Sequence, residues 1–158
     1  MQPRFNYAKL SPGAYNAMLT LEKYLSQSSL EEGLLLLVKL RVSQINGCAY
    51  CIDMHWKDLR SIGESEQRLY SLDAWRDCPY YTDRERSALA WAEALTLITQ
   101  SHASDDVYAE ASANFNETEI SDLTFAVITI NAWNRLAISG RTVPGTYQPS
   151  ATHETVTA

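Results

Sequence analysis

The chain has 158 residues, which is enough for one domain with a hydrophobic core and too few for two ordinary domains. Hydrophobic residues make up 46% of it and charged residues 20%, a composition typical of globular proteins rather than of disordered or fibrous ones. The formal charge of -6, with Lys and Arg scattered singly, argues against a phosphate-binding surface and therefore against a nucleic-acid partner.

The sequence carries no obvious targeting signal. The first ten residues lack an apolar core of signal-peptide length, and the longest aliphatic run, Leu34 to Val38, is far too short to span a bilayer. We therefore expect a cytoplasmic protein with no membrane partner. Three cysteines in such a chain do not form a structural disulfide framework, since the cytosol keeps most thiols reduced. A close Cys-x-x-Cys pair in that setting indicates redox chemistry or a metal site.

Helix signals follow one another along the chain, and we expect an all-α bundle of about seven helices. Ser11-Pro12 is a typical helix start, and Ser29, Thr82 and Asn116 are each followed three residues later by Glu, the spacing of a capping box. The expected helices cover, in chain order, residues 12 to at least 21, 29 to about 44, 48 to about 62, 65 to about 76, 82 to about 98, 105 to 115, and 116 to about 139.

These helices form a single domain that we place at residues 1–140. We expect an extended or disordered tail over residues 141–158, where Pro, Thr, Ser and Gly accumulate. Two stretches, 34–38 and 123–130, are apolar almost all round, and a helix without a polar face must be covered on every side. In so small a domain this pattern predicts burial against other subunits, so we expect an oligomer.

Cys48, Cys51 and His55 carry the strongest chemical signal. At about 100° per residue, they fall within an arc of about 60° on one helix face. Cys51 and His55 are one turn apart, so the imidazole can lie beside the sulfur, stabilise a thiolate and carry a proton. Cys48 lies near the helix N-terminus, whose partial positive charge also favours a thiolate. One thiolate can then attack a hydroperoxide or a disulfide, and the neighbouring cysteine can resolve the sulfenic acid or mixed disulfide.

Two other interpretations of these three residues remain open. They could form half of a zinc site, although the other candidate ligands, Cys78, His102 and His153, are isolated. They could also pack inertly, since a free cysteine behaves as a small hydrophobic side chain. Cys78 itself stands alone before a proline, and we interpret it as a structural thiol.

From Leu37 to His55 the chain reads LVKLRVSQINGCAYCIDMH, and this long segment resembles the alkylhydroperoxidase D (AhpD) branch of the carboxymuconolactone decarboxylase family. The resemblance covers most of the helical chain. It implies an all-helical AhpD-like fold, a homotrimer or homohexamer, and a thiol-dependent alkylhydroperoxidase or disulfide oxidoreductase that serves antioxidant defence. Cys51 would be the peroxidatic thiol, Cys48 the resolving thiol and His55 part of the proton relay. The resemblance implies no bound cofactor, but it does imply an external thiol reductant such as a lipoylated protein.

Two positions depart from the family pattern. Members often carry a relay Glu twelve residues before the first cysteine, where this chain has Leu36. Some members have His directly before the second cysteine, where this chain has Tyr50, a hydrogen-bonding group beside the thiols but a poor base at neutral pH. Glu93 and Glu119 are candidates to replace the missing carboxylate.

Two alternative functions also stay open. The family name also allows non-redox decarboxylation of a lactone, which would leave the cysteines without a role. A redox-sensing or zinc-stabilised interaction module is the third possibility.

The stretch from Asn131 to Arg135, NAWNR, also resembles the family. We interpret it first as a packing and subunit-interface segment and second as the wall of a pocket.

Overall fold

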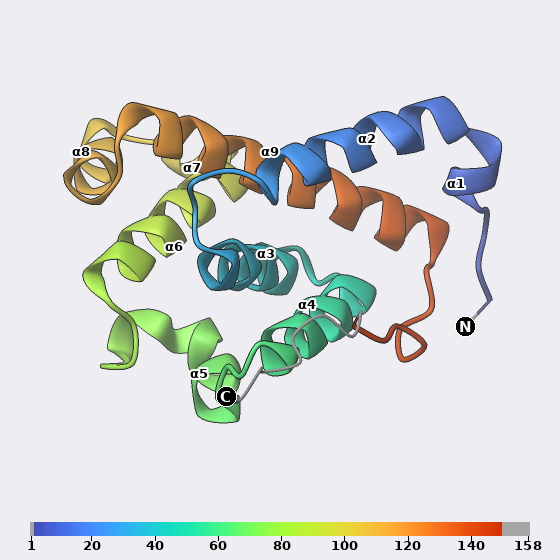
Figure 1. The fold of residues 1–158 in the computed structure, drawn as a ribbon, viewed down its shortest axis with the longest axis horizontal. Coiled ribbons are helices and arrows are strands. Elements are labelled where there is room, and N and C mark those ends of the chain that lie inside the picture. Colours follow the sequence, from blue (N-terminus) through green and yellow to red (C-terminus); the bar gives the residue numbers. More distant parts are fainter. Residues whose placement is uncertain (1, 150–158) are drawn as a thin grey trace, which may run out of the picture.

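The structure is a computed structural model that describes residues 2–149. It confirms the all-α prediction, because these residues form nine α-helices and one 3-10 helix and no strand. The elements, labelled in Figure 1, are α1 (Tyr7–Leu10), α2 (Pro12–Leu25), α3 (Glu32–Asn46), α4 (Ala49–Ser61), α5 (Glu66–Ser71), η1 (Leu72–Asp77), α6 (Asp83–Thr96), α7 (Ile98–Ser101), α8 (Asp105–Asn114) and α9 (Glu117–Gly140).

The expected count of about seven helices is too low for residues 2–149. Two of the additional helices, α1 and α7, are single turns of four residues, which are too short to show an apolar period. The helix expected over residues 65–76 divides into α5 and η1, and Ala74 leaves helical geometry at φ -110° and ψ 31°.

Two of the three predicted capping boxes are present. At Thr82 and at Asn116 the side chain accepts the backbone N–H three residues later, and the Glu at that position accepts the cap N–H in return. The capping box predicted at Ser29 is wrong. Ser29 lies in the bend after α2, and Glu31, with extended backbone at φ -62° and ψ 135°, becomes the N-cap of α3.

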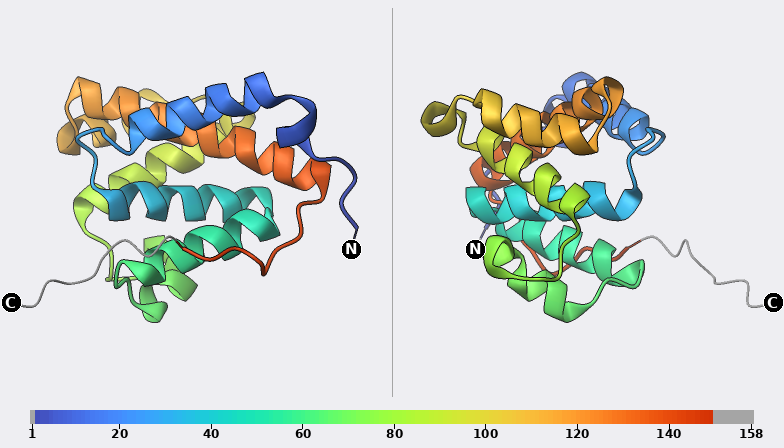
Figure 2. Two further views of the ribbon diagram at one scale, coloured as in Figure 1. Left: turned by 45° about the vertical axis from the view of Figure 1, so that its right-hand side comes forward. Right: turned by 90° about the vertical axis from the view of Figure 1, so that its left-hand side faces the viewer.

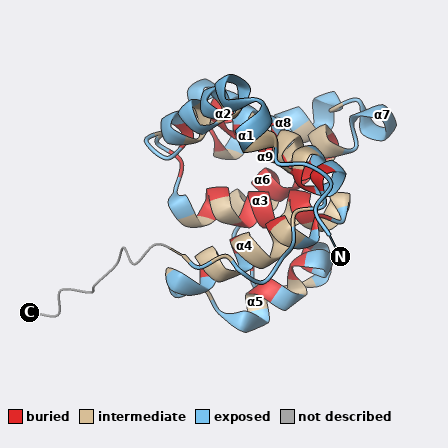
Figure 3. Ribbon diagram, turned by 90° about the vertical axis from the view of Figure 1, so that its right-hand side faces the viewer, coloured by how far each residue is buried: buried red, intermediate tan, exposed pale blue. Residues whose placement is uncertain are grey.

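Helix α3 lies at the centre of the bundle. A layer formed by α2 and α9 covers it on one side and α4 with α5 lies on the other (Figure 1), and the same layers appear in both views of Figure 2. The residues of α3 are mostly buried (Figure 3), and Leu37 and Val38 are almost inaccessible to solvent. The prediction that residues 34–38 need other subunits to cover them is therefore wrong, because helices of the same chain already do so.

Helix α9 differs from α3 in this respect. Leu123, Val127 and Ile130 are buried against the chain itself, but Phe125 is 45% exposed and Ile128 is 52% exposed. An oligomer therefore stays a prediction, and these two side chains are what now supports it. No helix within residues 2–149 is both long enough and apolar enough to cross a membrane.

The chain after α9 returns along α4, as the red segment in Figure 2 shows. Arg141 ends α9 with a left-handed backbone at φ 54°. The backbone N–H of Gly145 donates to Asp53 on α4, and the Tyr147 carbonyl accepts from Lys57 of the same helix. The rest of the predicted tail, residues 150–158 with His153, lies outside the described residues.

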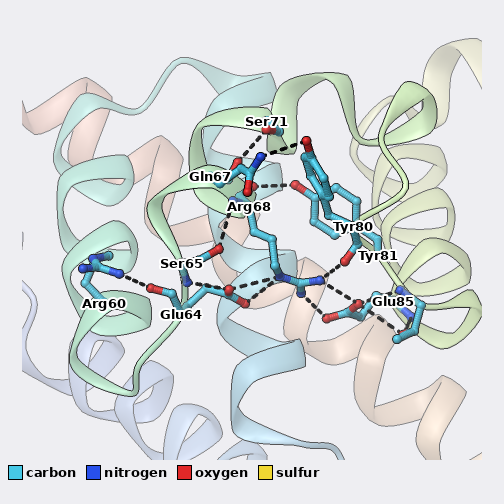
Figure 4. A network of polar contacts seen from close by, with 10 residues as sticks. Arg60, Glu64, Ser65, Gln67, Arg68, Ser71, Tyr80, Tyr81 and Glu85 are labelled. Carbon is cyan, nitrogen blue, oxygen red and sulfur yellow. Dashed lines mark hydrogen bonds and ion pairs between the residues drawn. The ribbon is translucent and has the colours of Figure 1, made fainter.

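Arg68 on α5 is the centre of a polar network that joins the layer of α4 and α5 to the start of α6 (Figure 4). Its Nε donates to both carboxylate oxygens of Glu64 at 3.0 and 3.1 Å, and its guanidinium also pairs with Glu85 and donates to the Tyr80 carbonyl. The Tyr81 hydroxyl donates to the Arg68 carbonyl. Because these groups satisfy one another and are only partly exposed, we interpret the network as structural.

We expect Arg68→Met to lower the free energy of unfolding by roughly 2 kcal/mol, since two carboxylates lose a charged hydrogen-bond partner. Arg60→Met is the control. Arg60 is exposed, its ion pair with Glu66 is long, at 3.8 Å, and its hydrogen bond to the Glu64 carbonyl is solvent-exposed, so its loss leaves no carboxylate without a close partner and should cost less than about 1 kcal/mol. Urea unfolding of both variants measures the difference, and equal effects would contradict the structural role of Arg68.

Candidate functional site

A tight turn between α3 and α4 sets the start of the reactive helix. Gly47 adopts a left-handed backbone at φ 67° and ψ 33°, a conformation that costs glycine little because it has no Cβ. The backbone N–H of Cys48 then donates to the Ser43 carbonyl at 3.0 Å, and Cys48 becomes the N-cap of α4. The turn therefore places Cys48 at the helix N-terminus, as the sequence predicts.

Two amides of α9 hold this turn in place. The side-chain amide of Asn46 donates to the side-chain oxygens Oδ1 of Asn131 at 3.0 Å and of Asn134 at 2.8 Å. The fully buried Asn134 in turn donates to the Ser43 hydroxyl at 3.1 Å. The stretch 131–135 thus packs within the chain, as its first interpretation expects, and its proposed contribution to a subunit interface stays a prediction.

The three predicted residues lie together on the buried face of α4. Cys48 and Cys51 form a disulfide with their Cα atoms 5.4 Å apart, and both are almost completely buried. His55 follows one turn later and is 5% exposed. The helical arc deduced from spacing is therefore the face that α4 turns toward the bundle.

Cys51 and His55 open onto a cavity of about 270 Å³, whereas Cys48 is not among the residues that line it. Five short segments of chain build its wall, and aromatic and aliphatic side chains make up most of it. The lining residues are Tyr7, Tyr15, Leu19, Glu22, Leu36, Lys39, Tyr50, Cys51, Met54, His55, Asp58, Trp133 and Ala137. The second interpretation of the 131–135 stretch, a pocket wall, is therefore confirmed for Trp133.

His55 is a buried polar ring without a full set of partners. Neither ring nitrogen makes a hydrogen bond within the described residues, and Nδ1 lies 3.5 Å from Oδ2 of Asp58, longer than a well-formed N–H···O bond. Burial lowers the pKa of His55 below its ordinary value of 6.5, and the Asp58 carboxylate opposes that shift only in part. The imidazole is therefore neutral at pH 7 and available as a base that faces a cavity.

The cavity also holds an ion pair that sequence reasoning missed. The Lys39 ammonium on α3 donates to Oε2 of Glu22 on α2 at 2.5 Å, and Trp133 Nε1 donates to Oε1 of the same carboxylate at 2.9 Å. Lys39 interrupts the apolar run from Leu34 to Leu40, which was a signal that could have found it. Glu22 lies on another helix, and nothing in its local sequence marks it.

The two candidates for the missing carboxylate were wrong. Glu93 accepts hydrogen bonds from Arg41 and Trp75 and pairs with Arg76, and Glu119 caps α9 and pairs with Arg84. Neither lines the cavity. Each carboxylate serves packing between helices instead, and the cavity takes its acidic groups from Glu22 and Asp58.

Tyr50 and Cys78 are the remaining predicted residues, and a zinc site is the remaining alternative. Tyr50 lines the cavity, and burial raises its pKa above the ordinary value of 10.0, so even less of it is ionised to the basic phenolate at neutral pH. Cys78 is a free, partly buried thiol that does not line the cavity. Among residues 2–149 no group of three or more His, Cys, Asp or Glu side chains is placed to hold a metal ion, so the zinc alternative has no ligand set there.

Comparison with known proteins supplies the family. The sequence model of the carboxymuconolactone decarboxylase family matches residues 12–94, a span from the start of α2 to near the end of α6 that includes Cys48, Cys51 and His55. The chain belongs to the carboxymuconolactone decarboxylase family. The resemblance inferred from the segment 37–55 is thereby confirmed at the level of the family.

Two known proteins are similar over most of the chain. The uncharacterized protein YdfG of Bacillus subtilis is 41% identical over 139 residues, which are 88% of this chain and 95% of YdfG. The crystal structure of ATU0492 from Agrobacterium tumefaciens, a protein of unknown function provisionally named as the antioxidant defence protein AhpD, is 43% identical and superposes with a TM-score of 0.89. That match covers 92% of this chain and 100% of ATU0492.

A more distant solved structure shares the fold. A peroxidase-related protein from Silicibacter sp. TM1040 is 24% identical and superposes with a TM-score of 0.75, covering 83% of this chain and 70% of that protein. The fold thus persists where most of the sequence has changed.

The buried neutral histidine makes stability depend on pH. Because the pKa of His55 is lower in the folded protein than the ordinary 6.5, the unfolded chain takes up a proton below about pH 6.5 that the folded protein does not. We expect the free energy of unfolding of the disulfide form to be constant above that pH. It should fall by up to about 1.4 kcal/mol per pH unit below it.

Urea unfolding between about pH 7.5 and pH 5 measures this slope. His55→Gln should flatten it, whereas His102→Asn, at an exposed left-handed position that asparagine tolerates, should keep the slope of the wild type. An unchanged slope in His55→Gln would show that other groups cause the pH dependence.

Proposed function

We propose that the chain is a thiol-dependent oxidoreductase that reduces hydroperoxides, with Cys51 as the peroxidatic thiol and Cys48 as the resolving thiol. One observation carries the proposal. Cys51 lies on the wall of a mostly apolar cavity beside a buried histidine with two unpartnered nitrogens, while Cys48 is within bonding distance but away from the wall. Substrate that enters the cavity therefore meets Cys51 first.

The cycle starts from the reduced pair. The Cys51 thiolate attacks the O–O bond of a hydroperoxide, and with one proton this gives a sulfenic acid on Cys51 and one molecule of alcohol. The Cys48 thiol then attacks that sulfenic acid, which releases water and forms the disulfide seen in the structure. An external dithiol reduces the disulfide by exchange, is itself oxidised to a disulfide and returns both thiols.

His55 and Lys39 divide the proton and charge work in this proposal. Neutral His55 accepts the proton of the Cys51 thiol and later returns it to the leaving alkoxide. The Lys39 ammonium stabilises both anions in a site where water and counter-ions are scarce. Glu22 holds the ammonium in place through its contacts to Lys39 and Trp133, and so takes the place of the carboxylate that Leu36 does not provide.

The electron donor in this proposal is a small dithiol or a lipoyl-type arm carried on a protein, because the cavity of about 270 Å³ admits a slender group but not a folded chain. A homotrimer or homohexamer and a cytoplasmic location stay predictions. Lactone decarboxylation is favoured by the family name alone, and it gives the thiol pair no role.

The thiol assignment predicts unequal effects of two similar substitutions. We expect Cys51→Ser to lower the rate of cumene hydroperoxide reduction with dithiothreitol by about 100-fold or more, because the nucleophile is lost. Cys48→Ser should accumulate a sulfenic acid on Cys51 that dimedone traps. Cys78→Ser is the control and should match the wild type. Equal activity of all four proteins would contradict the mechanism.

The proposed role of Glu22 predicts that a second substitution restores the titration of the Cys51 thiol. We expect Glu22→Gln to lower the pKa of the Cys51 thiol, measured by the pH dependence of alkylation in a Cys48→Ser, Cys78→Ser background, because the cavity loses a negative charge while the Lys39 ammonium remains. A second change, Leu36→Glu, places a carboxylate one turn before Lys39 on the same cavity wall and should restore the wild-type profile. Glu110→Gln, at an exposed position on α8, is the matched control. A Glu22→Gln profile identical to that of the control would exclude the role of Glu22.

A further inference from the structure

Three hydrogen bonds from two residues, Gly145 and Tyr147, fasten the segment after α9 to the reactive helix. The Gly145 N–H donates to Oδ2 of Asp53 at 3.0 Å, and Lys57 donates to the Tyr147 carbonyl at 3.1 Å. The Tyr147 hydroxyl donates to Oδ1 of Asp58 at 2.6 Å. We call residues 142–149 the C-terminal strap. Asp53 and Lys57 lie one turn apart and also pair with each other at 3.0 Å, so the strap binds a preformed site on α4.

Asp58 connects the strap to the histidine. One of its oxygens, Oδ1, accepts the Tyr147 hydroxyl, and the other, Oδ2, lies 3.5 Å from Nδ1 of His55. The carboxylate therefore cannot rotate away from the ring without losing the short bond to the tyrosine. Asp58 and His55 both line the cavity that holds Cys51.

This arrangement bears on which nitrogen of His55 carries the proton. In a neutral imidazole one nitrogen donates and the other accepts, and a neighbouring acceptor selects the tautomer. The charged groups around the ring are Asp58 on its own helix, Lys39 on α3 and Glu22 on α2. Of these, Asp58 has a carboxylate oxygen placed beside Nδ1, so it favours the tautomer with the proton on Nδ1.

We propose that Tyr147 is a positioning residue for the thiol chemistry: by holding Asp58 it keeps His55 in the Nδ1–H tautomer and leaves Nε2 free to accept a proton in the cavity. The proposal rests on the proposed function for its effect on catalysis, but not for its effect on the tautomer. A residue of the extended C-terminal segment thereby completes a site built from helices.

The strap also lines a second cavity beside the first. A second cavity of about 410 Å³ adjoins the first, and the two share Tyr7, Tyr15 and Tyr50 as a common wall. Thr142, Val143 and Thr146 of the strap line this outer cavity. Loss of the strap therefore removes both the Asp58 contact and part of the wall of this outer cavity, so a single-atom change at Tyr147 is needed to separate the two effects.

Tyr147→Phe removes only the hydroxyl, and Tyr70→Phe at an exposed position of α5 is the matched control. Nitrogen-15 NMR of the imidazole in the disulfide form reports the tautomer directly. We expect the Nδ1–H form in the wild type and in Tyr70→Phe, and a shift toward Nε2–H in Tyr147→Phe and Asp58→Asn. The same tautomer in all four proteins would overturn the proposal.

Catalysis gives a second readout. Tyr147→Phe should lower kcat/KM for cumene hydroperoxide about tenfold, as is typical when the partner of a catalytic group's neighbour is lost. A loss of stability in Tyr147→Phe without any change in tautomer or in kcat/KM would assign the tyrosine a packing role only and overturn the proposal. If the wild type reduces no peroxide, the proposed function fails, and the NMR measurement still decides the role of Tyr147.

Two truncations keep the test independent of the point variants. A chain that ends at residue 149 retains the strap and should match the wild type in tautomer and activity. A chain that ends at residue 142 loses Tyr147 and should behave like Tyr147→Phe or worse. Wild-type behaviour of the shorter chain would also overturn the proposal.

Discussion

The amide pairing between Asn46 and α9 is the interaction on which the site depends. It fixes the end of α3 against Asn131 and Asn134 at 3.0 and 2.8 Å, and the chain can then reverse only through the left-handed Gly47. Because Cys48 caps the next helix directly after that glycine, the direction of α4 and the face it buries are decided at this point. Loss of an amide partner here would leave polar groups unsatisfied and weaken the turn that positions Cys48.

Burial then sets the chemistry of the cavity. The same burial that keeps His55 neutral also removes water from around Lys39 and Glu22. The desolvation penalty of this ion pair offsets much of its electrostatic attraction, so the pair adds little to the stability of the fold. Removing both charges for apolar residues would be a simpler way to fill this space. A paired lysine kept beside a cysteine cavity is therefore more readily explained by the anions that thiol chemistry produces than by stability.

The sequence predicted the parts of this structure that are local. The arc of Cys48, Cys51 and His55 follows from helical spacing alone, and the capping boxes at Thr82 and Asn116 are four-residue patterns. It could not place Glu22 or Tyr147, because Glu22 reaches Lys39 on α3, and Tyr147 reaches Asp58 on α4, from segments whose own sequences are ordinary. The wrong assignments of Glu93 and Glu119 have the same origin, since a carboxylate's partners lie on other helices.

Residues at distant positions in the sequence can serve the same place in the cavity, as Leu36 and Glu22 show. Both line the cavity together with Lys39, so a carboxylate one turn before Lys39 on α3 and a carboxylate on α2 can both pair with the Lys39 ammonium. The proposed mechanism requires a negative group that holds Lys39 in the cavity that Cys51 lines, and Glu22 on α2 meets that requirement here. Under this mechanism the absence of a glutamate at position 36 does not by itself predict an inactive protein, because Glu22 pairs with Lys39 from α2.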